Sequence, residues 1–141
     1  MVLQRGVTLN KKSVMKKILL LLFTVLCLIS CEKDDASLGN ETQLSEGVFE
    51  PTTGINVTGS AKIYSKNGER KVVLENFTIS EGPDLKVYLS TSAAPDTFIN
   101  LGDLNPATEY SIPDGVNLGT YSYVLIHCQQ YNHLFAIAKQ E

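Results

Sequence analysis

Two alternating runs of residues, joined by an Asn-Gly pair, constrain the fold of this chain most strongly. Apolar and polar side chains alternate along "INVTGSAKIYS", residues 55–65, and the run "RKVVLENFTI", residues 70–79, follows it closely. Between them stands Lys66-Asn67-Gly68-Glu69, in which Asn-Gly supplies the positive φ angles of a tight turn. We therefore predict a β-hairpin across residues 55–79, in which one face is formed by Ile55, Val57, Ala61 and Ile63.

The rest of the chain repeats this pattern of short strands separated by turn residues. After the turn Gly82-Pro83-Asp84, "LKVYLST" alternates Leu85, Val87 and Leu89 against Lys86, Tyr88 and Ser90. Further strands are expected at residues 98–101, 109–113, 120–128 and 132–140, and no convincing amphipathic helix is found. The run "TYSYVLIHC", residues 120–128, is apolar on both faces, which indicates a central buried strand. We therefore predict an all-β single domain, an antiparallel β-sandwich or a barrel.

The first 30 residues are expected to be a signal peptide rather than part of the fold. In "MKKILLLLFTVLCLISC", which begins at Met15, two lysines precede an apolar run that is too short to span a bilayer comfortably. A small residue, Ser30, stands before Cys31. Met15 is therefore an alternative start to Met1.

Leu28-Ile29-Ser30-Cys31 resembles a bacterial lipobox, in which cleavage falls just before the cysteine. The resemblance implies lipid attachment at Cys31 and a protein anchored to the membrane of the cell envelope, not spanning it. The alternative is an ordinary secretory signal that ends in cysteine. The following "EKDDAS" resembles a surface-export signal of some Gram-negative lipoproteins, which implies an outer-membrane rather than a cytoplasmic-membrane anchor and a surface-exposed domain. Its alternative is a solvated acidic linker.

Residues 31–46 are polar and are expected to form the lipidated end and a flexible acidic tether, so that the folded domain spans residues 47–141. Five of the 12 basic residues and none of the 15 acidic ones precede Cys31, which leaves 7 basic and 15 acidic side chains and a net charge of −8. Such a domain repels phosphate backbones, which argues against nucleic acid as a partner.

Cys128 is the one cysteine expected inside the domain, because Cys27 leaves with the signal peptide and Cys31 is lipidated. No intrachain disulfide is then available, and the thiol could be a core residue, a redox group or a metal ligand. A metal site would use His127, Cys128 and His133. Neighbouring residues of a strand point to opposite faces, so His127 and Cys128 are poorly placed to bind one ion.

No motif for enzymatic chemistry is present. The sequence has no phosphate-binding glycine loop, no nucleophile elbow and no zincin helix. The aspartates lie beside proline or glycine or in predicted loops, where this residue favours turns. We therefore expect neither a catalytic centre nor a cofactor.

Five short motifs, in order, resemble the DM13 domain family. They are Val57-Thr58-Gly59, Asn76-Phe77, Gly82-Pro83-Asp84-Leu85, Leu101-Gly102-Asp103-Leu104 and Ile126-His127-Cys128. The resemblance covers roughly residues 47–139 and implies a β-sandwich-like domain with a single characteristic cysteine, here Cys128, and a proposed role in electron transfer. The family usually has an aromatic residue such as Trp in place of His127, and Phe-Gly in place of Phe135-Ala136.

Two functions from different classes follow. The first is a redox, electron-transfer or interaction module centred on Cys128, with a redox protein as its partner, which needs an accessible thiolate. The alternative is a structural or adhesive surface domain that binds through residues 92–105 and 114–120 and keeps Cys128 in its core. Accessibility of the thiol distinguishes the two.

Overall fold

The computed structural model describes residues 40–104 and 108–141. All of them belong to a compact unit that spans Ser37–Glu141. The predicted signal peptide, the alternative start at Met15 and the lipid-attachment residue Cys31 lie outside the described residues. Within the described part of the chain, no helix is long and apolar enough to cross a membrane.

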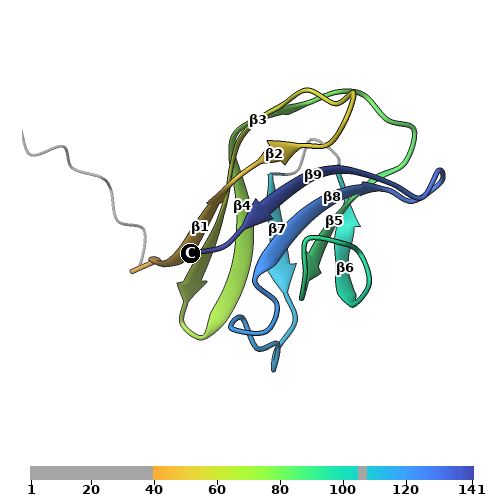
Figure 1. The fold of residues 1–141 in the computed structure, drawn as a ribbon. Coiled ribbons are helices and arrows are strands. Elements are labelled where there is room, and N and C mark those ends of the chain that lie inside the picture. Colours follow the sequence, from red (N-terminus) through yellow and green to blue (C-terminus); the bar gives the residue numbers. More distant parts are fainter. Residues whose placement is uncertain (1–39, 105–107) are drawn as a thin grey trace, which may run out of the picture. The chain divides into compact units, whose positions relative to one another are not determined.

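The described residues form two antiparallel sheets that face each other across one core, which confirms the all-β fold (Figure 1). The four-stranded sheet has the order β1-β3-β4-β7, and the five-stranded sheet has the order β2-β9-β8-β5-β6. The strands are β1 (Thr42–Val48), β2 (Glu50–Pro51), β3 (Val57–Lys66), β4 (Glu69–Ile79), β5 (Leu85–Ser90), β6 (Phe98–Asp103), β7 (Glu109–Ile112), β8 (Tyr123–Cys128) and β9 (His133–Lys139).

The predicted hairpin is the β3–β4 pair. Lys66 pairs with Glu69, and Asn67 and Gly68 have φ angles of 53° and 89°, as the Asn-Gly turn requires. The predicted face is also confirmed, because Ala61 and Ile63 are buried in the core. Ile55 and Val57 pack against this core from its margin.

β1 corrects the expected domain boundary. Residues 42–46 were assigned to the flexible tether, but they pair with β3 from Thr42 opposite Ser65 onward. The pattern of burial explains the error, since Gly47 is the strand's single buried residue and Leu44 and Val48 are exposed. An edge strand of this kind lacks the apolar alternation by which strands are recognised.

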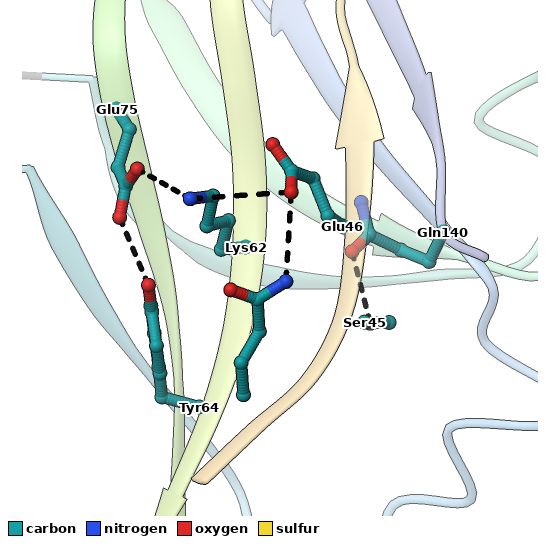
Figure 2. Close-up of polar contacts among 7 residues, drawn as sticks. Ser45, Glu46, Lys62, Tyr64, Glu75 and Gln140 are labelled. Carbon is teal, nitrogen blue, oxygen red and sulfur yellow. Dashed lines mark hydrogen bonds and ion pairs between the residues drawn. The ribbon is translucent and has the colours of Figure 1, made fainter. Parts of the chain in front are cut away.

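Polar contacts on the outer face of the four-stranded sheet hold β1 in place instead (Figure 2). The Lys62 ammonium lies 2.8 Å from the Glu75 carboxylate on β4 and 3.9 Å from that of Glu46 on β1. The Tyr64 hydroxyl donates to Glu75 at 2.9 Å, and Gln43 donates to Glu46 at 3.5 Å. The bond with Lys62 lowers the pKa of Glu75. Exposed pairs of this kind contribute little singly, but the network joins three strands.

The chain crosses from one sheet to the other between β1 and β2. Phe49, at the crossing, is buried and contacts Phe77 edge to face with ring centroids 5.1 Å apart. Just before it, the backbone groups of Glu46 and Glu141 exchange two hydrogen bonds of 3.2 and 3.1 Å. The C-terminus therefore lies against β1, as Figure 1 shows, and the sandwich is closed along this side.

Candidate functional site

Cys128 lies in the core of the sandwich. It is the last residue of β8, the middle strand of its sheet, where it pairs with Leu85 on one side and His133 on the other. Its exposed fraction is 0%, and it shares the core-facing side of β8 with Val124 and Ile126, as the alternation predicted. Among the described residues it is the one cysteine, and it is unpaired.

Two turns meet at the end of the sandwich that contains Cys128. The amide of Gln129, which follows Cys128, donates to the carbonyl of Asp84 at 2.9 Å. The turn of residues 129–132 is completed by a bond of 3.3 Å from the Asn132 amide to the Gln129 carbonyl, and Asn132 has a φ of 48°. Gly82 fits closely beside these turns, because a Cβ there would lie 2.7 Å from Leu85. Cys128 thus lies where β8 ends and runs directly into a turn.

His127 points to the opposite face of the same sheet, yet it is also buried, with an exposed fraction of 5%. Its ring stacks on Tyr88 with centroids 5.2 Å apart, and its Nδ1 atom has no hydrogen-bond partner. Burial lowers the pKa of His127, the hydrogen bond with Asn132 partly opposes this shift, and His133 lowers it further. At neutral pH the ring is therefore uncharged.

Tyr88 corrects the expected character of this outer face. The alternation grouped it with Lys86 and Ser90 as the polar side of β5, but Tyr88 is 1% exposed and Ser90 is fully buried. Tyr88 stacks between His127 and Phe98, with centroids 4.1 Å apart on the Phe98 side. The Ser90 hydroxyl donates to the carbonyl of Ala94 at 2.8 Å, which fixes the loop that follows β5.

Lys86 carries the charge on this face and is already paired. Its ammonium lies 2.7 Å from the Asp84 carboxylate and also binds Asp103. Hydrogen bonds to these two carboxylates raise the pKa of Lys86. In the sheet, Lys86 lies directly opposite His127.

The structure does not bring the three residues of the metal hypothesis together. His127 and Cys128 face opposite sides of the sheet, and His133 is exposed on β9. Throughout residues 40–104 and 108–141, no group of three or more His, Cys, Asp or Glu side chains is arranged to hold a metal ion.

The two segments expected to form binding loops differ in the structure. Much of the first, residues 92–105, is strand β6, and its residue 105 lies outside the described part. In the second, the Arg70 guanidinium donates to the carbonyls of Val116 at 2.8 Å and Pro113 at 3.4 Å. The Asn117 side chain accepts from two backbone amides of the same loop. The second loop is therefore tied to the domain and braced internally by side-chain hydrogen bonds.

A hollow of about 480 Å³ lies elsewhere on the domain. Neither Cys128 nor the two histidines line it, and of the predicted binding loops Ala93 in residues 92–105 does. Two of its three glutamates are engaged, because Glu141 binds Lys139 and Glu46 binds Lys62. Its lining residues are Glu46, Gly47, Val48, Glu50, Ala93, Tyr123, Ile137, Lys139 and Glu141.

Sequence reasoning missed three residues that shape the site, namely Tyr88, Phe98 and Asn132. The burial of Tyr88 depends on Phe98, whose strand pairs with β5 in a register that the sequence does not fix. The hydrogen bond between Asn132 and His127 could not be predicted, because it forms only once the turn of residues 129–132 is folded. The Asn-His dipeptide at a predicted strand start was the signal for Asn132, since Asn tolerates positive φ angles.

These features define an all-β, two-sheet sandwich whose described thiol lies in the core at the end of the central strand of one sheet. Over residues 49–139 the chain matches the family described as "Electron transfer DM13", and it belongs to that family, as the motifs predicted. No curated protein and no solved structure matches the chain. The family's Phe-Gly is Phe135-Ala136 here, and Ala136 is fully buried in the core.

Proposed function

We propose that this chain is an envelope lipoprotein whose DM13 domain takes part in electron transfer through Cys128. Membership of a family described by electron transfer carries the proposal. The position of Cys128 supports it, because the thiol lies beside the turn of residues 129–132 and not in the middle of a strand. Connections between strands generally open at a lower free-energy cost than the strands of the core.

A single thiol can exchange electrons with a disulfide of a partner protein. The Cys128 thiolate attacks one sulfur of that disulfide, a new S–S bond forms, and the other sulfur leaves as a thiolate that takes up a proton. The partner is then linked to Cys128 by this mixed disulfide and carries one free thiol. In the second step a dithiol of an electron-donor protein attacks the Cys128 sulfur, the first partner leaves fully reduced, and the donor closes to a disulfide as it releases Cys128 as a thiol. Because Cys128 is fully buried in the closed domain, both steps require local opening.

The first test is titration of the chain from Glu32 onward, which contains Cys128 as its one thiol. We expect an Ellman-type reagent to label it completely without denaturant, but far more slowly than in urea, because the reagent waits for opening. The variant Cys128→Ser serves as the blank. Labelling that occurs only after global unfolding would contradict a redox role for this thiol.

The second candidate function is a non-redox binding or structural surface domain in which Cys128 is a core residue. Its complete burial among apolar side chains favours this function, since free cysteine packs like a small hydrophobic residue. Protection of the thiol up to global unfolding would select this candidate.

The membrane anchor has its own test. We expect the full chain to incorporate a fatty acid and to sediment with membranes, because more than one acyl chain gives stable anchoring. Cys31→Ala should lose both properties, whereas Cys27→Ala, which alters a cysteine within the signal peptide, should keep them. Fatty-acid labelling that persists in Cys31→Ala would show that the anchor lies elsewhere.

A further inference from the structure

His127 and Cys128 are neighbours in sequence at the end of β8, where the strand runs into a turn. The turn of residues 129–132 follows Cys128 directly, and its last residue, Asn132, forms a hydrogen bond with the His127 side chain. Opening this turn would therefore loosen the end of β8, which carries both side chains. The two side chains share one local opening event, although they point in opposite directions.

The closed structure accommodates only the uncharged form of His127. The ring is 95% buried, stacks on Tyr88 and lies opposite Leu134 in the sheet. Its Nδ1 atom has no hydrogen-bond partner, so a proton added there would place an unsatisfied N–H in an apolar setting. A buried charge without a partner is costly unless the structure rearranges.

The charged groups around His127 do not compensate a second charge. Lys86 on β5 lies directly opposite it and is a cation, and His133 on β9 also disfavours its protonation. The carboxylates of this region, Asp84 before β5 and Asp103 on β6, both bind Lys86. Asn132 in the turn supplies one neutral hydrogen bond.

We propose that protonation of His127 opens the turn of residues 129–132 and brings the Cys128 thiol to the surface. The charged ring reaches water by moving outward with Asn132, and the bond between the Gln129 amide and the Asp84 carbonyl breaks. This inference rests on the proposed redox function of Cys128, whose access it regulates. Acid conditions would then favour the reactive form of the domain.

The sign of the effect follows from proton linkage. The closed form lowers the pKa of His127 below its ordinary value of 6.5, whereas the open form leaves the ring in water. The open form therefore binds more protons as the pH falls, and acid shifts the equilibrium toward it. Between the two pKa values, the opening constant rises by up to about tenfold for each unit of pH.

The experiment measures labelling of Cys128 between pH 5 and pH 8 with a pyridyl disulfide, which remains reactive in acid. Dividing each rate by that of the urea-unfolded chain at the same pH removes the titration of the thiol itself. We expect the normalised rate to rise as the pH falls below 6.5, by at most about tenfold per unit. In His127→Phe, which keeps a ring against Tyr88 but cannot be protonated, the rise should vanish. His127→Gln provides the same test if the phenylalanine variant does not fold.

His133→Gln is the matched control, because it removes the neighbouring exposed histidine and should keep the pH dependence. A native labelling rate that does not depend on pH, or a rise in rate that survives in both His127 variants, would overturn the proposed control of opening by His127. The redox proposal would then remain intact. A thiol that stays protected at every pH would overturn both. Hydrogen exchange at the amides of residues 129–133, corrected for intrinsic rates, should show the same pH dependence as the labelling rate. That dependence should vanish in the His127 variants.

Discussion

Gly47→Ala should be among the most destabilising single substitutions in this domain. A Cβ at residue 47 would lie 2.3 Å from the carbonyl oxygen of Lys139 and 2.8 Å from its carbonyl carbon, and backbone atoms cannot rotate away. The strain acts where β1 meets the C-terminal segment, so the two backbone hydrogen bonds between Glu46 and Glu141 should also weaken. We expect a loss of about 3 kcal/mol in the free energy of unfolding, measured by urea denaturation.

For a domain of this size, that loss lowers the melting temperature by roughly 12–24 °C. Gly119→Ala is the matched control, because the nearest atom to its added Cβ is the Asn117 side-chain oxygen at 3.2 Å, and the residue is exposed. We expect this control to cost less than about 1 kcal/mol. Equal stabilities of the two variants would mean that β1 does not approach the C-terminal segment as closely as described.

The sequence was informative wherever one face of a strand is buried and a turn has its own chemistry. The β3–β4 hairpin is the clearest case, since Asn67 and Gly68 adopt the positive φ angles that the dipeptide permits. The central position of β8 also followed from its sequence, because a strand covered on both sides is apolar throughout.

The edge strands could not be predicted in the same way. β1 is exposed at five of its seven positions and is held by pairs such as Lys62 with Glu75 and Glu46, which need three strands to be aligned first. β2 has two residues, Glu50 and Pro51, which is too short for any periodicity. Both elements depend on the sandwich that they help to close.

In the candidate site too, local features could be predicted from the sequence, whereas features that depend on several strands could not. Alternation placed Cys128 and His127 on opposite faces, and this is a local property of any strand. The burial of the outer face is not local. It arises because Phe98 on β6 covers Tyr88 and Tyr88 covers His127, and a register shift of β6 would undo it. His127 is therefore a buried titratable group whose cover comes from neighbouring strands.

Tyr88→Ala should destabilise the domain by about 3–5 kcal/mol, the usual cost of removing a buried aromatic side chain from a packed site. Tyr88 is 1% exposed and is the largest fully buried side chain described. Its loss would also remove two ring contacts, with Phe98 and His127, each of which contributes about 0.5–1.5 kcal/mol beyond simple burial. Urea and thermal unfolding measure the effect, which corresponds to roughly 12–40 °C in melting temperature.

Tyr88→Phe tests how much the hydroxyl contributes to stability apart from the ring. Burial raises the pKa of Tyr88, so the phenol is uncharged in the fold. The phenylalanine variant should therefore retain stability to within about 1 kcal/mol, because the stacked ring is preserved. A loss in Tyr88→Phe as large as in Tyr88→Ala would assign the stabilisation to the hydroxyl. A small loss in both would mean that the outer face of the five-stranded sheet is open to solvent, and His127 would then titrate as an exposed residue.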